Sequence, residues 1–116
     1  MEVWRDIEGY EGLYQVSNLG RVRSLKKNKM IMKPFVNEEG YLRITLLKDR
    51  KKNNLRVHRL VAKAFIYNKD NKPEVNHINA IKSDNKVNNL EWVTPKENMK
   101  HANDLGLIKR RKRKVI

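Results

Sequence analysis

The sequence predicts an α+β fold, in which a small N-terminal antiparallel sheet precedes a strand–loop–strand–helix (ββα) unit. Two observations carry this prediction. The first half of the chain alternates apolar and polar residues, as half-buried strands do, whereas the second half contains two stretches with helical spacing. A length of 116 residues suits one compact domain, or one small domain with an arm.

The chain is strongly basic, with 27 lysines and arginines against 13 aspartates and glutamates, a formal net charge of +14. This imbalance favours a polyanionic partner, above all nucleic acid. No apolar run approaches the length of a membrane span, and the mixed, acidic N-terminus is unlike a signal peptide. We therefore expect a cytoplasmic protein that contacts no membrane. Because cysteine is absent, any metal must be held by His, Asn, Asp, Glu or water, which favours Mg²⁺ or Mn²⁺.

The first strands form a predicted hairpin. Residues 14–17 and 21–24 alternate, and Gly20 in the connection supplies a positive φ. Arg21 and Arg23 share the face opposite the core. They are either an ordinary solvated strand face or phosphate contacts, a role that suits the forked guanidinium.

A second small sheet follows. We expect a short strand at 30–32, a clearly alternating strand at 41–47, a basic turn at 49–54 and a returning strand at 55–58. The basic side chains of this sheet that are candidates for DNA contact are Arg43, Lys51 and Lys52.

Two helices are predicted in the second half. Leu60, Val61, Ala64 and Phe65 form an apolar helical stripe, which we interpret as a brace between the sheet and the ββα unit. Arg59, at its start, is a further candidate for DNA contact, whereas His58 is expected to be structural.

The second helix has the strongest local signal. Thr94 suits the N-cap, Pro95 the first helical position and Glu97 the third, which together form a capping box. The helix is expected to run to Leu105 and to stop at Gly106.

Potential ligands and a potential base gather between these elements. A strand ends at His77 after Asn76, and Asn98 and His101 share one face of the second helix. Phosphodiester hydrolysis needs a base, for which neutral imidazole at His77 is suited. A divalent ion between the side-chain oxygens of Asn76 and Asn98 would supply the electrophile and stabilise the leaving oxygen. The spacing permits this chemistry without singling it out.

Several segments resemble the HNH nucleases, and within them the phage and intron-encoded homing endonucleases. The matching segments of the core are 76–79 (NHIN), 88–92 (NNLEW) and 97–102 (ENMKHA). Residues 4–7 (WRDI) and 9–22 (GYEGLYQVSNLGRV) resemble the module that often precedes that core, and 57–62 (VHRLVA) also fits.

The resemblance implies a ββα-metal (HNH, His-Me finger) core that hydrolyses DNA. His77 would be the general base, and Asn89 would tie the loop and orient that base. Asn98 would be a metal ligand, and Asn76 stands where the family often has Asp, so the motif supplies no ligand carboxylate. Asp84 or His101 is a candidate to compensate. The implied cofactor is one divalent ion, Mg²⁺ first and Mn²⁺ as the alternative.

We accordingly expect an N-terminal module at 1–56 that contacts DNA, a nuclease core at 57–106 and a basic tail at 107–116. The partner would be double-stranded DNA, which the chain would nick, acting as a monomer or a dimer. Further candidates for DNA contact are His101, Lys109, Arg110 and Arg111. Two other functions remain open: a non-catalytic DNA-binding protein built on an HNH nuclease, and a ribosome-associated basic protein.

Overall fold

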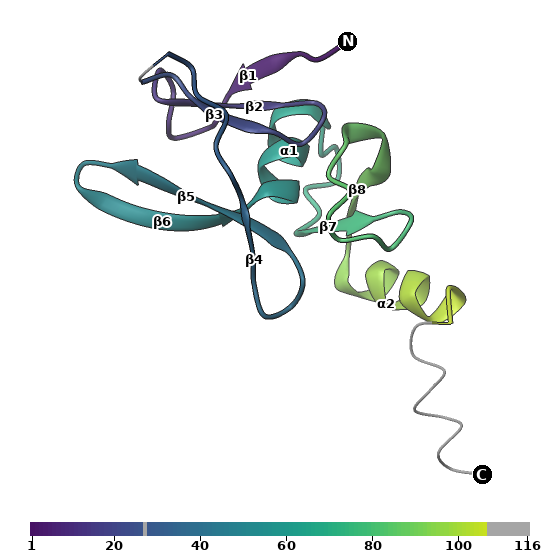
Figure 1. Ribbon diagram of the computed structural model, residues 1–116. Coiled ribbons are helices and arrows are strands. Elements are labelled where there is room, and N and C mark those ends of the chain that lie inside the picture. Colours follow the sequence, from purple (N-terminus) through teal and green to yellow (C-terminus); the bar gives the residue numbers. More distant parts are fainter. Residues whose placement is uncertain (27, 107–116) are drawn as a thin grey trace.

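The computed structural model describes residues 1–26 and 28–106 (Figure 1). Its architecture is α+β, as the sequence predicts, with small antiparallel sheets and two α-helices in the described part. The elements are β1 (Trp4–Asp6), β2 (Tyr14–Ser17), β3 (Val22–Ser24), β4 (Phe35–Val36), β5 (Leu42–Lys48), β6 (Lys51–Arg56), α1 (Val57–Phe65), β7 (Glu74–His77), the 3₁₀-helix η1 (Val87–Asn89), β8 (Leu90–Val93) and α2 (Pro95–Asp104). Within the described ranges, neither α-helix has the length and apolarity needed to cross a membrane.

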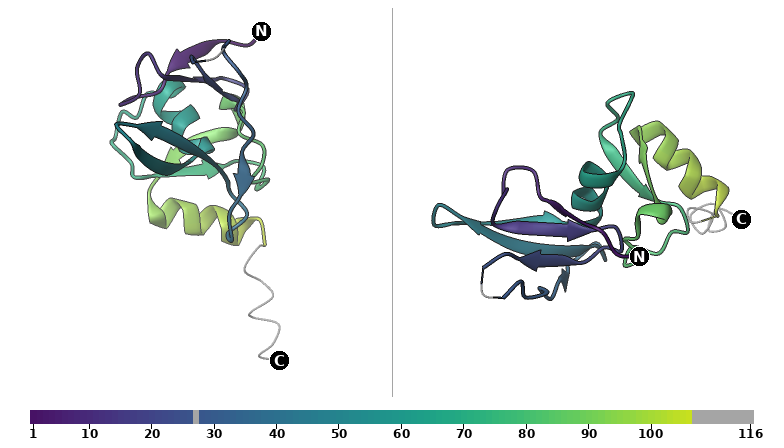
Figure 2. Two further views of the ribbon diagram at one scale, coloured as in Figure 1. Left: turned by 60° about the vertical axis from the view of Figure 1, so that its left-hand side comes forward. Right: turned by 90° about the horizontal axis from the view of Figure 1, so that it is seen from above.

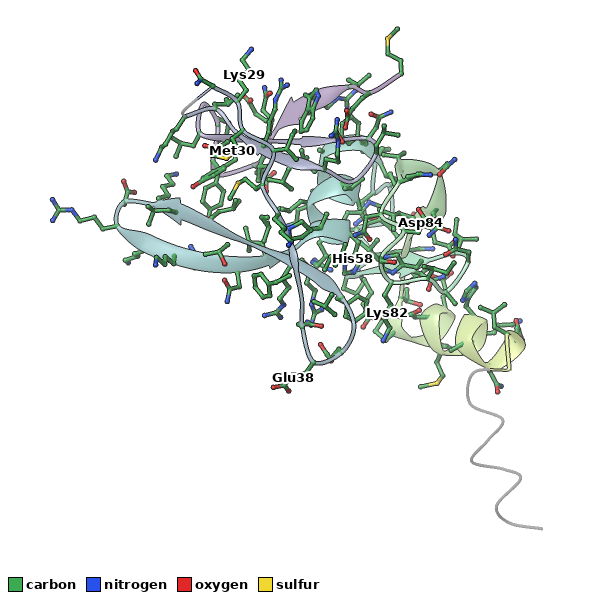
Figure 3. All side chains as sticks on the ribbon, in the orientation of Figure 1. Lys29, Met30, Glu38, His58, Lys82 and Asp84 are labelled. Atoms are coloured by element: carbon green, nitrogen blue, oxygen red, sulfur yellow. The ribbon has the colours of Figure 1, made fainter. Side chains whose placement is uncertain are left out.

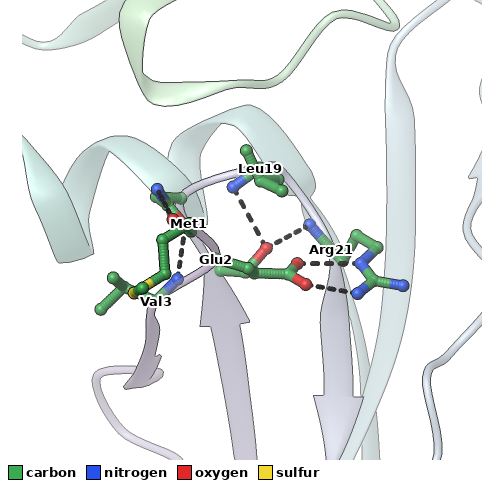
Figure 4. A network of polar contacts seen from close by, with 7 residues as sticks. Met1, Glu2, Val3, Leu19 and Arg21 are labelled. Atoms are coloured by element: carbon green, nitrogen blue, oxygen red, sulfur yellow. Dashed lines mark hydrogen bonds and ion pairs between the residues drawn. The ribbon is translucent and has the colours of Figure 1, made fainter.

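The first sheet has the strand order β1-β2-β3 and contains the predicted hairpin. Val16 lies directly opposite Val22, and both side chains are buried. The hairpin turn is anchored to the chain terminus: Asn18 Oδ1 accepts a hydrogen bond from Val3 N at 2.7 Å, and Arg21 pairs with Glu2 (Figure 4). This anchoring fixes the position of the turn, which reaches the second half of the molecule.

The second sheet has the order β4-β5-β6, and the β5–β6 ribbon extends away from the rest of the fold (Figure 1). The prediction of a long basic turn at 49–54 is wrong. The turn consists of Asp49 and Arg50, with φ of 51° and 65°, as a two-residue hairpin turn requires. Strand β6 therefore begins at Lys51 rather than at Leu55, and His58 lies in α1 rather than in a strand.

The strand predicted at 30–32 is also absent as an element. Only Ile31 forms an isolated bridge, to Arg23, and the strand of this region is β4, directly after Pro34. Proline has no N–H to donate, so it is tolerated at the start or edge of a strand.

One hydrophobic core joins both halves of the chain. Helix α1 has contacts with β2, β5 and β6 on one side and with β7 and β8 on the other (Figure 2). Its buried residues Leu60, Val61 and Ala62 fall on the predicted apolar stripe or beside it. This helix is the brace that positions the ββα unit against the N-terminal sheets.

The ββα unit forms as predicted. Strands β7 and β8 pair antiparallel, with His77 opposite Leu90. Helix α2 starts with a complete capping box, in which Glu97 N donates to Thr94 Oγ1 and Thr94 N donates to Glu97 Oε1. The cap fixes where the helix begins and so places Asn98 in its first turn.

Candidate active site

An open pocket of about 440 Å³ lies between β7, the loop after it and α2. Asn76, His77, Asn98 and His101 all line this pocket, so the structure brings together the residues predicted at this centre. Helix α2 contributes Asn98 and His101 from one face, whereas Asn76 and His77 come from the end of β7.

His77 is held in a buried, hydrogen-bonded setting. Its side chain is 4% exposed, and Nε2 lies 2.7 Å from Asn85 Oδ1. With the Asn85 oxygen facing Nε2, the matching tautomer has its proton on Nε2 and its basic nitrogen at Nδ1. Burial lowers the pKa of His77, although the Asn85 contact opposes the shift. The imidazole is therefore neutral at neutral pH, the state that a general base requires.

The loop between β7 and β8 is held by two asparagines with separate tasks. Asn89 Oδ1 accepts from Asn79 N at 3.0 Å, and its Nδ2 donates to Asn79 Oδ1 and to Asp84 O, both at 2.9 Å. Asn89 thus ties the loop, as expected, but the hydrogen bond to the His77 ring comes from Asn85. The sequence analysis missed Asn85, because its neighbours Asp84 and Asn88 look equally polar in sequence.

A second buried histidine supports the first. The His58 ring lies 4.8 Å from the His77 ring and stacks on Tyr41 at 5.0 Å, with the planes 12° apart. Burial lowers the pKa of His58 to about 3, and repulsion from His77, once that ring is protonated in acid, acts in the same direction. Figure 3 shows His58 within the body, with Lys82 nearer the pocket; Lys82 Nζ lies 4.7 Å from the centre of the Tyr41 ring. His58 is therefore a neutral packing residue beside the predicted base.

Asn76 and Asn98, the predicted metal ligands, each donate a hydrogen bond to a carboxylate. Asn98 Nδ2 donates to Glu74 Oε1 at 3.0 Å, and Asn76 Nδ2 donates to Glu91 Oε2 at 2.8 Å. The sequence analysis missed both glutamates, although Glu74 is two residues before Asn76 and therefore on the same face of β7.

The donor set fits a hard divalent ion. No group of three or more His, Cys, Asp or Glu residues suited to metal binding occurs in the described ranges. The side-chain oxygens on the pocket wall include the amides of Asn76 and Asn98 and the carboxylate of Glu74. Mg²⁺ keeps several waters and is usually held by only one or two protein carboxylates, with substrate phosphate completing its shell. Asp84 does not line the pocket, and its Oδ2 accepts from Asn79 Nδ2 at 2.9 Å.

The predicted DNA-contacting residues fall into four groups. Lys51 and Lys52 are exposed on the β5–β6 ribbon. Others already have partners within the fold: Arg21 pairs with Glu2, Arg23 with Gln15, Arg59 with Pro73 O, and His101 with Ile78 O. Arg43 is half-buried, with its Nε unpaired within the described residues. Lys109, Arg110 and Arg111 lie outside the described residues.

The ββα unit and its pocket have the arrangement expected of an HNH core, and comparison with known proteins agrees. Residues 55–100 match the family described as HNH endonuclease, and residues 2–47 match the NUMOD4 motif. The chain belongs to the HNH endonuclease family and carries a NUMOD4 motif ahead of the HNH domain. HNH endonucleases generally use a divalent metal ion.

Particular relatives are similar over most of this chain. A solved structure of DNA binding and cleavage by the HNH homing endonuclease I-HmuI matches with a TM-score of 0.83 and 42% identity, over 90% of this chain and 59% of that one. The DNA endonuclease I-HmuI of Bacillus phage SP01 is 42% identical over 105 residues, 90% of this chain and 60% of the relative. The uncharacterized HNH endonuclease L247 of Acanthamoeba polyphaga mimivirus is 46% identical over 120 residues, 99% of this chain and 29% of the relative. The chain thus spans less than two thirds of either relative.

Proposed function

We propose that this protein is a divalent-metal-dependent endonuclease that nicks double-stranded DNA. One arrangement carries the proposal: the buried imidazole of His77 lines the same pocket as the amides of Asn76 and Asn98. The name of I-HmuI, a DNA endonuclease, supports DNA as the substrate class. One such pocket per chain suits the cutting of one strand at a time, and a double-strand break would need a second copy or a second event.

The geometry supports a role for each of these residues. His77 takes the proton of the attacking water at Nδ1, while Asn85 holds the ring at Nε2. Asn89 keeps the loop closed around that contact. Asn76 and Asn98 would hold the divalent ion, Mg²⁺ or Mn²⁺, through their side-chain oxygens. When bound there, such an ion would supply Lewis-acid stabilisation of the charge on the phosphate and on the leaving oxygen.

The N-terminal module at 1–56 and the tail at 107–116 supply phosphate contacts, and the core at 57–106 supplies the chemistry. Lys51 and Lys52 are the candidates with most freedom to reach a phosphate, because both are exposed on a projecting ribbon. Contacts of this kind set affinity and position more than sequence choice.

Plasmid nicking tests the proposal. Supercoiled plasmid is incubated with the protein in Mg²⁺, in Mn²⁺ and in EDTA, and the assay is repeated with His77→Ala. We expect nicking with either metal, none with EDTA, and loss in His77→Ala with salt-dependent DNA binding retained. Nicking that survives the substitution would remove His77 from its role.

A second candidate is a non-catalytic DNA-binding protein. It is favoured by one observation, that both predicted metal ligands are uncharged amides. This candidate predicts salt-sensitive DNA binding with no nicking in any divalent ion.

A further inference from the structure

Each amide at the predicted metal site is paired with its own carboxylate. Glu74 lies on the same face of β7 as Asn76 but reaches across to Asn98 on α2, where its Oε1 accepts from Nδ2 at 3.0 Å. Glu91 is the residue directly opposite Asn76 in the β7–β8 pair, and its Oε2 accepts from Nδ2 at 2.8 Å. The first contact joins β7 to the first turn of α2, and the second joins the paired strands β7 and β8. In both, an asparagine NH₂ group donates to a glutamate carboxylate.

The pairing determines which end of each amide remains available. An ionised carboxylate only accepts hydrogen bonds, so the amide facing it must present its NH₂ group. Turning either amide by 180° would place its oxygen against a negatively charged oxygen. Among the described residues, no hydrogen bond to Asn76 Oδ1 or Asn98 Oδ1 is found, so each oxygen is left as the free polar atom.

We propose that Glu74 and Glu91 are positioning residues that fix the amides of Asn98 and Asn76 with their oxygens presented to a divalent cation. This inference rests on the proposed function and concerns the same site. An amide without such a partner presents its NH₂ end as readily as its oxygen, and the NH₂ end repels a cation.

Binding of Mn²⁺ to the protein without DNA, followed by electron paramagnetic resonance of the free ion, tests the proposal without relying on activity. Glu74→Leu and Glu91→Leu remove the acceptor, whereas Glu74→Gln and Glu91→Gln keep an acceptor and remove the charge. We expect each Leu variant to weaken Mn²⁺ binding by about tenfold or more, as loss of a residue that orients a ligand typically does. Each Gln variant should weaken binding less than the matching Leu variant does, because its carbonyl oxygen can still accept from the amide, although its NH₂ group also permits the reversed orientation.

Glu38→Gln is the matched control for loss of one negative charge. Glu38 is exposed at the tip of the β4–β5 loop, where its side chain points away from the body (Figure 3). The Mn²⁺ affinity of the Glu38→Gln variant should equal that of the wild type. Leu variants that bind Mn²⁺ as the wild type does would overturn the proposal. Gln variants as weak as the Leu variants would also overturn it, because charge or direct ligation, and not amide orientation, would then be what matters.

A reciprocal variant keeps the test decisive if a Leu substitution disturbs folding. In Asn76→Asp there is no amide to orient, and Glu91 faces a second carboxylate. Glu91→Gln in that background should strengthen Mn²⁺ binding or leave it unchanged, and a loss would contradict the proposed role. Asn98→Ala distinguishes failure of the metal site from failure of the positioning role. If Asn98→Ala leaves Mn²⁺ binding intact, Asn98 is not a metal ligand, and both proposals fail. If it weakens binding while the Glu→Leu variants do not, only the positioning role fails.

Discussion

At the scale of single residues, hydrogen bonding and position give two neighbouring buried histidines different roles. His58 and His77 are both 4% exposed, and their rings are 4.8 Å apart. Burial lowers both pKa values, but only His77 has a polar side-chain partner and a place on the pocket wall. His58 packs against Tyr41 and cannot reach the pocket without displacing that ring. The neutral state that both share keeps two positive charges from forming side by side.

Asn85→Asp should move the acid limb of the cleavage profile to higher pH. If His77 is the base, as proposed, cleavage requires its neutral form, so the rate of the wild type should rise with pH through a pKa below the usual 6.5. A carboxylate at Nε2 favours the protonated imidazole and raises that pKa. The variant should therefore lose activity near pH 6 and recover it at higher pH, which a pH–rate series measures. Asn88→Ala, an exposed neighbour in the same loop, should leave the profile unchanged.

His58→Phe should flatten the acid side of the stability profile while keeping a ring in place. Unfolded His58 takes up a proton near pH 6.5, whereas the folded protein does so only near pH 3. Between these values the unfolded state binds more protons, so the free energy of unfolding falls as the pH falls, by up to about 1.4 kcal/mol per unit. Urea unfolding of both proteins from pH 7 to pH 4 should show a steeper decline in the wild type. Parallel declines would mean that His58 is not neutral when folded.

At the scale of elements, the start of α2 controls the site because Asn98 lies in its first turn. Thr94→Ala should lower the free energy of unfolding by about 1 kcal/mol, the usual loss for a removed N-cap. Fraying of that turn should also weaken Mn²⁺ binding. Thr94→Ser keeps the hydroxyl and should restore both properties. Urea unfolding and Mn²⁺ titration measure the two effects, and a stability loss without weaker Mn²⁺ binding would separate the cap from the site.

The boundaries of elements were predictable where a residue type strongly favours one backbone position, such as a turn or a helix N-cap. Gly20 marked the β2–β3 turn, and Thr94 with Glu97 marked the start of α2. The end of β5 and the start of β6 were not predictable, because 51–54 is polar on both faces and shows no alternation. Asp49 and Arg50 both adopt positive φ, but an Asp-Arg pair is a much weaker indicator of a two-residue turn than Asn-Gly or Asp-Gly. The polar partners within the site escaped prediction for a related reason: Glu91 meets Asn76 only once the strand register is known.

At the scale of the whole molecule, the N-terminal hairpin contacts the half of the chain that contains the candidate site. Val87 N donates to Asn18 O at 2.9 Å, which joins the loop before β8 to the β2–β3 turn. Gly20 lies so close to Asn85 that a Cβ there would be 2.9 Å from both Asn85 Cβ and Asn85 O. Asn85 in turn holds the His77 ring. The N-terminal module therefore supports the residue that holds the predicted base.

Gly20→Ala tests this connection, and Gly9→Ala is its matched control. The two glycines have φ of +87° and +85°, so alanine meets the same backbone strain at both, about 1–2 kcal/mol. At Gly9 nothing lies within 4 Å of the added Cβ, whereas at Gly20 it meets Asn85. Gly20→Ala should therefore be the more destabilising, and it should also displace Asn85 and free the His77 ring.

The consequence should appear in three measurements. Nicking should fall far more in Gly20→Ala than in Gly9→Ala, even at a temperature where both proteins are folded. The ring resonances of His77 in NMR spectra should shift in Gly20→Ala alone, because its Nε2 partner moves. Affinity for DNA should change little in either variant, since neither glycine carries a charge. Equal losses of nicking in the two variants would show that backbone strain, and not the contact with Asn85, accounts for the effect.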